Sequence, residues 1–140
     1  MPDFNTNLWA PWRMEYIRSL GPETTDDGCF LCRYWANPQD DASNHVVLRG
    51  QSAYVVMNRF PYTNGHLMVA LAEHKADITE LTDSEWVEMT RLTRDAVALL
   101  RAAIKPQGFN VGYNLGRCAG AGLPGHLHAH IVPRWDGDTN

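Results

Sequence analysis

Several features that define large protein classes are scarce in this sequence. Its 140 residues include only three cysteines, an odd number that is a poor basis for a disulfide framework. No apolar run approaches the roughly 18 residues that a membrane-spanning helix needs, so no membrane partner is expected. Residues 1–12 lack a basic stretch followed by an apolar one, and we therefore expect a cytoplasmic protein without a secretory signal.

Basic residues are outnumbered as well. The 12 Lys and Arg residues against 16 Asp and Glu residues give a net charge of −4. A protein that binds nucleic acid usually carries a basic patch or stripe, so we expect no nucleic-acid partner. A small anionic substrate is compatible with this charge, because backbone N–H groups and a few local donors can hold a phosphate group. The 44% hydrophobic content predicts a folded core in a chain that has the length of one domain.

The pattern of apolar residues predicts a sheet. Short runs rich in β-branched and aromatic residues indicate strands, and residues 50–52 between the first two runs indicate a hairpin. Residues 37–44 are polar and are expected to form a loop. The five expected strands span residues 45–49, 53–58, 66–71, 109–114 and 127–134.

A long helix interrupts this series of strands. Apolar side chains recur every three or four residues between Trp86 and Ala103, which is typical of an amphipathic helix. Thr82 and Glu85 have the spacing of a capping box at its start, and Pro106 marks its end. Strands on both sides of one helix indicate an α+β domain with an antiparallel sheet, of which the helix covers one face.

The sequence of residues 1–28 indicates an irregular arm with a short helix after Pro11. Two Trp residues, a Tyr and an Ile lie within ten residues of this arm, so we expect it to pack on the domain or on a partner subunit. The domain itself is expected to span residues 29–140.

Three of the six histidines lie close together near the end of the chain. His126, His128 and His130 alternate with apolar residues, so in a strand their imidazoles would line one face. The row could be the polar side of an exposed strand, a set of metal ligands, a nucleophile with its supporting groups, or a mixture of the last two. The preceding loop, residues 116–125, contains four glycines, whose backbone lets N–H groups converge on an anion. The glycine-rich loop next to the histidines therefore favours the interpretation as a nucleophile beside a phosphate-binding site.

Cys29 and Cys32 have the spacing of a zinc knuckle and also that of a redox-active pair. A redox function is disfavoured because no thioredoxin-like βαβ pattern surrounds the pair. A closed tetrahedral zinc site needs two more ligands, for which His45, His74 and His126 are candidates. The pair could also be two thiols without a metal.

Residues 126–132, with the sequence His-Leu-His-Ala-His-Ile-Val, resemble the signature of the histidine triad (HIT) family, His-φ-His-φ-His-φ-φ with φ an apolar residue. Asn58 before a Pro-containing turn, the long helix and Asn114 are also similar to this family. Residues 8–17 and 133–138 resemble a bacterial branch whose members are described as diadenosine polyphosphate phosphorylases or hydrolases. The resemblance covers nearly the whole chain. It implies a HIT-like fold with a five-stranded antiparallel sheet, one long covering helix and a short N-terminal helix.

The resemblance implies a nucleotide hydrolase or nucleotidylyltransferase that cleaves a phosphoanhydride or phosphoramidate bond. His128 would be the nucleophile that forms a nucleotidyl-histidine intermediate. The other catalytic residues would be His130 and His66, which contact phosphate oxygens or orient the site, and His126 of the triad. A neutral imidazole is well populated near neutral pH, since the unperturbed pKa of histidine is about 6.5. The substrate would be a diadenosine polyphosphate or another conjugate of AMP, with phosphate or water as the acceptor.

Nucleotide binding is implied for a further group of residues. Asn58 would bind the ribose and Asn114 the α-phosphate. Asn58 and Asn114 could also be strand-end residues without a role in binding, and His66 could be a strand histidine without a catalytic role. Backbone N–H groups around Ala121, Gly122 and Leu123 would help to hold the phosphate.

For the cysteine pair, the resemblance selects a structural zinc site formed by Cys29, Cys32, His74 and His126. Members of the family are typically homodimers, and the Trp-rich arm is expected to contribute to that interface. Similar bacterial proteins continue beyond the position of Asn140 with a segment that shapes the substrate site, so the sequence leaves substrate specificity open. The alternative function is that of a nucleotide-binding or zinc-stabilised interaction protein without turnover.

Overall fold

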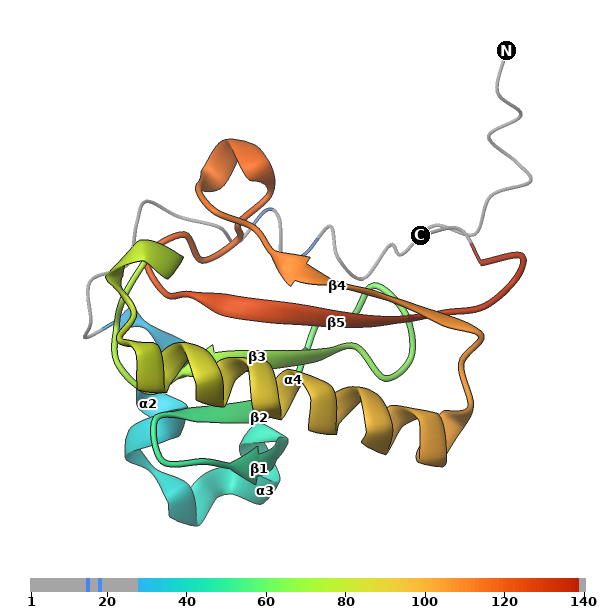
Figure 1. Ribbon diagram of the computed structural model, residues 1–140, viewed down its shortest axis with the longest axis horizontal. Coiled ribbons are helices and arrows are strands. Elements are labelled where there is room, and N and C mark those ends of the chain that lie inside the picture. The colour runs from blue at the N-terminus through green and yellow to red at the C-terminus, as the bar shows by residue number, and fades with distance from the viewer. Residues whose placement is uncertain (1–14, 16–17, 19–27, 139–140) are drawn as a thin grey trace.

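The computed structural model describes Glu15, Arg18 and residues 28–138 of the chain. The helix expected after Pro11 and the Trp-rich arm fall largely outside these described residues. One antiparallel sheet forms the centre of the described part and has helices on both faces (Figure 1), which confirms the predicted α+β architecture. No helix in this part has the length and apolar character that a membrane crossing requires.

The sheet consists of β1 (Val46–Arg49), β2 (Ala53–Met57), β3 (Leu67–Leu71), β4 (Gly108–Tyr113) and β5 (His128–Arg134). Their order is β1-β2-β3-β5-β4, and every neighbouring pair is antiparallel. β1 and β2 form the predicted hairpin. β5 comes last in the sequence but lies between β3 and β4, so both of its sides are hydrogen-bonded within the sheet.

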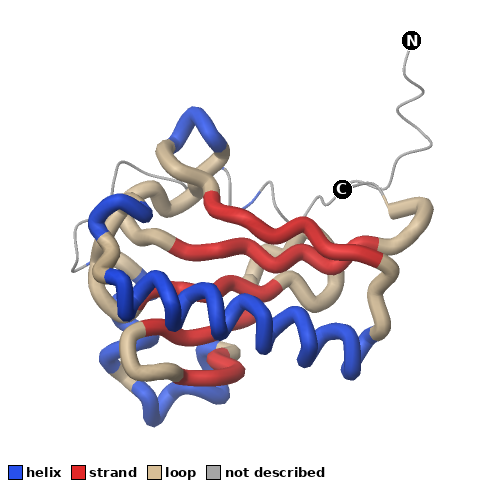
Figure 2. The backbone as a smooth tube through the Cα atoms, viewed as in Figure 1, coloured by secondary structure: helices blue, strands red, loops and turns tan. Residues whose placement is uncertain are grey.

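Helix α4 (Asp83–Ile104) crosses one face of the sheet (Figure 2). Its predicted capping box is present, because Thr82 and Glu85 each accept a hydrogen bond from the backbone N–H of the other. Lys105 adopts a left-handed conformation after the last turn, just before Pro106. The buried apolar residues of α4 pack on the residues of β2, β3 and β5 that point to this face; they are Met89, Leu92, Ala96 and Leu100.

Helix α2 (Phe30–Ala36) lies against the opposite face of the sheet. The fully buried Tyr54 of β2 joins the two layers, since its hydroxyl donates to the carbonyl oxygen of Leu31 at 2.8 Å. Burial raises the pKa of the Tyr54 hydroxyl, so the group stays protonated and keeps its role as donor. The start of α2, which carries the cysteine pair, is thereby held against the sheet.

The prediction of a polar loop at residues 37–44 is wrong. The chain forms a short 3-10 helix, η2 (Pro38–Asp40), followed by one turn of α-helix, α3 (Asp41–Asn44). The guanidinium of Arg49 donates to the Asp41 carboxylate and to two carbonyl oxygens at the end of α2. A side chain from β1 therefore fixes these turns, and such a contact is not visible in the local pattern of polar residues.

Candidate active site and metal cluster

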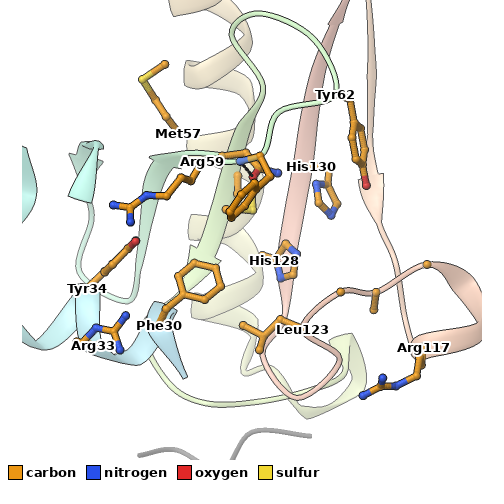
Figure 3. Close-up of a pocket in the computed structure, with 16 residues that line it drawn as sticks. Phe30, Arg33, Tyr34, Met57, Arg59, Tyr62, Arg117, Leu123, His128 and His130 are labelled. Carbon is orange, nitrogen blue, oxygen red and sulfur yellow. Dashed lines mark hydrogen bonds between the residues drawn. The ribbon is translucent and has the colours of Figure 1, made fainter. Parts of the chain in front are cut away.

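A cavity of about 500 Å³ opens on the α2 face of the sheet. Its walls come from α2, from the residues that follow β2, from the glycine-rich loop and from β5 (Figure 3). Phe30, Tyr34 and Met57 make one side of it apolar and aromatic. His128 and His130 line it from β5. The topology thus brings the second and third triad histidines to one cavity with an apolar wall.

His128 is held in a defined orientation and tautomer. Its side chain is buried, and its Nδ1 lies 2.8 Å from the carbonyl oxygen of His126. A carbonyl oxygen only accepts, so Nδ1 carries the proton and Nε2 has the lone pair. Burial lowers the pKa of His128, and the bond to His126 offsets this only in part. The imidazole is therefore neutral at physiological pH and can act as a nucleophile through Nε2.

His66 and His130 form a second, directed chain of hydrogen bonds. The backbone N–H of Tyr62 donates to His66 Nδ1 at 3.1 Å, so the proton of this buried imidazole resides on Nε2. His66 Nε2 lies 2.9 Å from His130 Nδ1 and must be the donor in that contact. His130 in turn carries its proton on Nε2, where it can donate to an oxygen atom of a bound ligand. His66 is not among the residues that line the cavity, and its hydrogen bond can fix the orientation of the His130 imidazole.

The glycine-rich loop forms the wall opposite α2. It includes the 3-10 turn η4 (Arg117–Ala119), which is bracketed by Gly116 and Gly120 with φ angles of 84° and 95°. These values lie in the left-handed region that glycine adopts without strain. Ala121, Gly122 and Leu123, for which the resemblance implies a phosphate contact, line the cavity.

The two predicted asparagines occupy different places. Asn58 lines the main cavity, and its Oδ1 accepts the backbone N–H of Phe60 at 2.9 Å. Asn114 lines a second, shallower cavity instead, which it shares with His130 and β4. Asn58 thus shares the main cavity with His128, while Asn114 shares the second cavity with His130 and has its side-chain nitrogen close to Gly120 of the glycine-rich loop.

The remaining triad histidine, His126, faces a different site. The sequence pattern predicts three imidazoles on one strand face, but β5 begins only at His128. The chain bends at His126, and its Nδ1 points at the thiols of Cys29 and Cys32, at 3.2 and 3.3 Å. The prediction of a single row is wrong at this position, because the bend allows His126 to leave the plane of the strand.

Cys29, Cys32, His74 and His126 form a cluster whose four ligand atoms all lie within 4.8 Å of one another. Nε2 of His126 donates to the carbonyl oxygen of Leu71 at 2.7 Å, which leaves the lone pair of Nδ1 directed at the cysteines. Two sulfur and two nitrogen donors are the ligand set of a closed tetrahedral metal site. The four residues can thus hold a metal ion, and His45, the other candidate ligand, is not among them.

Sequence patterns missed several residues of the cavity. The aromatic pair of α2, Phe30 and Tyr34, lies one helical turn apart and thus on the same side of the helix. In a segment expected to be helical, this four-residue spacing indicates that the two rings share one face. The cavity also contains Arg33, Arg59 and Arg117, for which the local sequence offers no comparable signal.

Comparisons with known proteins find similar sequences. The HIT domain pattern matches residues 39–137. An AP-4-A phosphorylase of Mycobacterium tuberculosis is 40% identical over 137 residues, which cover 95% of this chain and 70% of that protein. An adenosine 5′-monophosphoramidase of Schizosaccharomyces pombe is 34% identical over 74 residues, or 53% of this chain and 52% of its own length.

Solved structures show the same fold. A zinc-bound histidine triad family protein from Mycobacterium smegmatis has a TM-score of 0.70 at 23% identity, over 81% of this chain and 80% of that one. A HIT family member from Bacillus subtilis has a TM-score of 0.71 at 24% identity, over 80% of this chain and 77% of that one. Given the match over residues 39–137 and the 40% identity to the mycobacterial relative, the chain belongs to the histidine triad (HIT) family.

Proposed function

We propose that this protein is a nucleotidyl-transferring enzyme that cleaves diadenosine polyphosphates through a covalent intermediate on His128. The observation that carries the proposal is the bond between His128 Nδ1 and the His126 carbonyl oxygen, which leaves Nε2 as a nucleophile at the cavity. The 40% identical relative is an AP-4-A phosphorylase, and this identity supports the same class of substrate here.

The proposed reaction has two steps. In the first, His128 Nε2 attacks the α-phosphorus of the substrate, an N–P bond forms, and the P–O bond to the departing nucleoside polyphosphate breaks. The His126 carbonyl stabilises the positive charge that develops on the imidazole, through the Nδ1 proton. In the second step, water or inorganic phosphate attacks the same phosphorus, the N–P bond breaks, and AMP or ADP is released while His128 returns to its neutral form.

The surrounding groups are suited to this transfer. The protonated Nε2 of His130 and the backbone around Ala121 and Gly122 can donate to the equatorial oxygens, whose charge must be stabilised in the transition state. The apolar side with Phe30 and Tyr34 suits an adenine ring, and Asn58 at the same cavity suits a ribose hydroxyl. We also propose a phosphate contact for Asn114, which lies next to His130 in the second cavity and close to Gly120 of the main one.

We further propose that the cluster of Cys29, Cys32, His74 and His126 binds structural zinc. Thiolate and imidazole ligands in a closed set of four suit this ion. When bound, zinc would neutralise the thiolates and link the start of α2, the segment that follows β3 and the segment that precedes β5. His126 would then hold the backbone carbonyl on which the tautomer of His128 depends.

We also propose that residues 29–140 form the HIT domain, that residues 1–28 form an arm, and that the protein acts in the cytoplasm. None of the three described cysteines forms a disulfide bond, and a reducing compartment keeps such thiols available as ligands.

We expect the protein to be a homodimer in solution. β4 is an edge strand, and Val111 on it is 48% exposed. Trp86 of α4 is 42% exposed and lies beside Tyr113 of β4, with ring centroids 5.8 Å apart. An apolar patch along a sheet edge suits association with a second copy. Light scattering after size exclusion measures the mass, and a monomer at all concentrations would contradict the proposal.

The activity is tested by incubating the protein with diadenosine tetraphosphate, with and without inorganic phosphate. We expect turnover to AMP and ATP in water, or to ADP and ATP when phosphate is the acceptor, as separated by ion-exchange chromatography. The same assay with adenosine 5′-phosphoramidate measures activity toward a phosphoramidate bond. If the protein binds AMP but converts none of these substrates, it is a nucleotide-binding protein without turnover.

A further inference from the structure

The main cavity is positively charged although the chain has a net charge of −4. Arg33, Arg59 and Arg117 line it together with His128 and His130. No Asp or Glu among the described residues lines the same cavity. The positive charge at the cavity is therefore not neutralised by acidic side chains in its walls.

The three cavity arginines differ from most other described arginines in their partners. Among the described residues, none of the three forms an ion pair or a hydrogen bond through its side chain; Arg33 only has its guanidinium 5.9 Å from the Tyr34 ring centroid. Four arginines elsewhere each pair with a carboxylate: Arg49, Arg91, Arg94 and Arg134. The guanidinium groups at the cavity are thus available to an anion from outside.

The arginines lie on different sides of the nucleophile. Figure 3 shows Arg33 and Arg59 on the same side of His128 as Phe30 and Tyr34, and Arg117 on the other side. An adenosine bound against the aromatic side would place its α-phosphate at His128. The phosphate chain of the substrate then continues away from the nucleoside, toward the loop that carries Arg117.

The glycine-rich loop brings Arg117 to the cavity. Gly116 and Gly120 bracket η4, and Arg117, Gly120, Ala121 and Gly122 of this loop line the cavity. A guanidinium can bind two phosphate oxygens at once, which makes arginine well suited to a polyphosphate chain.

We propose that Arg117 is the specificity-determining residue that binds the phosphates beyond the scissile bond and so selects substrates with a polyphosphate leaving group. The inference rests on the proposed function, because it assumes that the α-phosphate meets His128. It implies that Arg117 contributes to the binding of ATP, which carries β- and γ-phosphates, but not to the binding of AMP, which ends at the α-phosphate.

The test compares Arg117→Gln with the unaltered protein in two assays. Calorimetry at low ionic strength should show an ATP affinity reduced about tenfold, as expected for one charge-assisted contact near solvent, and an unchanged AMP affinity. In turnover assays, kcat/KM should fall by a similar factor for diadenosine tetraphosphate and stay unchanged for adenosine 5′-phosphoramidate, whose leaving group is uncharged. Arg117→Lys should restore part of the loss, since it keeps the charge.

Arg94→Gln is the matched control, because Arg94 is 73% exposed on α4, on the other face of the sheet from the cavity. It should change neither nucleotide affinity. Equal losses for AMP and ATP in Arg117→Gln would overturn the inference, as would no loss at all. If the unaltered protein turns over neither substrate, the proposed function fails, while the two affinities still decide the role of Arg117.

Discussion

Replacing His128 with Ala should reduce the turnover of diadenosine tetraphosphate by about 10⁴-fold or more, because His130, the other described histidine at the cavity, carries its proton on Nε2 and cannot attack through it. His66 and His130 are hydrogen-bonded to each other, and His126 faces the two cysteines. Rapid quenching and intact-mass measurement should detect an adenylyl adduct on the unaltered protein and none on His128→Ala.

The variant must also be shown to fold. AMP binding and the melting temperature of His128→Ala check that the cavity persists, since deletion of a buried imidazole leaves a gap. His45→Asn is a suitable histidine control: His45 is exposed, does not line the cavity and has a φ of 61°, which Asn tolerates. Activity of His128→Ala within about tenfold of the unaltered protein would show that the nucleophile has been assigned to the wrong residue.

Loss of the metal should have the second large effect. Cys32→Ser is expected to abolish zinc binding and to lower the free energy of unfolding on the order of 5 kcal/mol, because ligand binding energy at a structural zinc site contributes directly to folding. Metal content by mass spectrometry and urea unfolding measure the two quantities. A decrease in turnover should accompany them, since His126 links the cluster to His128.

Cys118→Ser is the matched control for this experiment. Cys118 is exposed on the glycine-rich loop and lies outside the cluster, so metal content and unfolding should not change. The zinc proposal would be contradicted by an unaltered protein that contains no zinc as purified and gains no stability when zinc is added.

The sequence was most informative where structure depends on local periodicity. The alternation after residue 127 correctly placed His128 and His130 on one face of a strand, because side chains of a strand alternate with a period of two. The capping box at Thr82 was equally predictable, since its hydrogen bonds join residues three apart.

Features that depend on contacts between distant segments were not predictable in the same way. The bend turns His126 toward cysteines that lie 97 and 94 positions earlier in the sequence, and only the family resemblance selected this contact. That Asn114 shares a second cavity with His130 also depends on the pairing of β4 with β5, which is not visible in its local sequence. Arg33, Arg59 and Arg117 look like ordinary surface cations until the topology brings them to one cavity.

The position of β5 between β3 and β4 has a consequence for errors in folding. His128 pairs with Ala70 of β3, and His130 pairs with Met68 of β3 and Gly112 of β4. A slip of β5 by one residue would turn the imidazoles toward the apolar layer under α4 and turn Ala129 and Ile131 toward the cavity. The misaligned state would bury polar rings without hydrogen-bond partners, and its free energy would therefore lie above that of the native state. The stability of the core therefore selects the strand register that places His128 at the cavity.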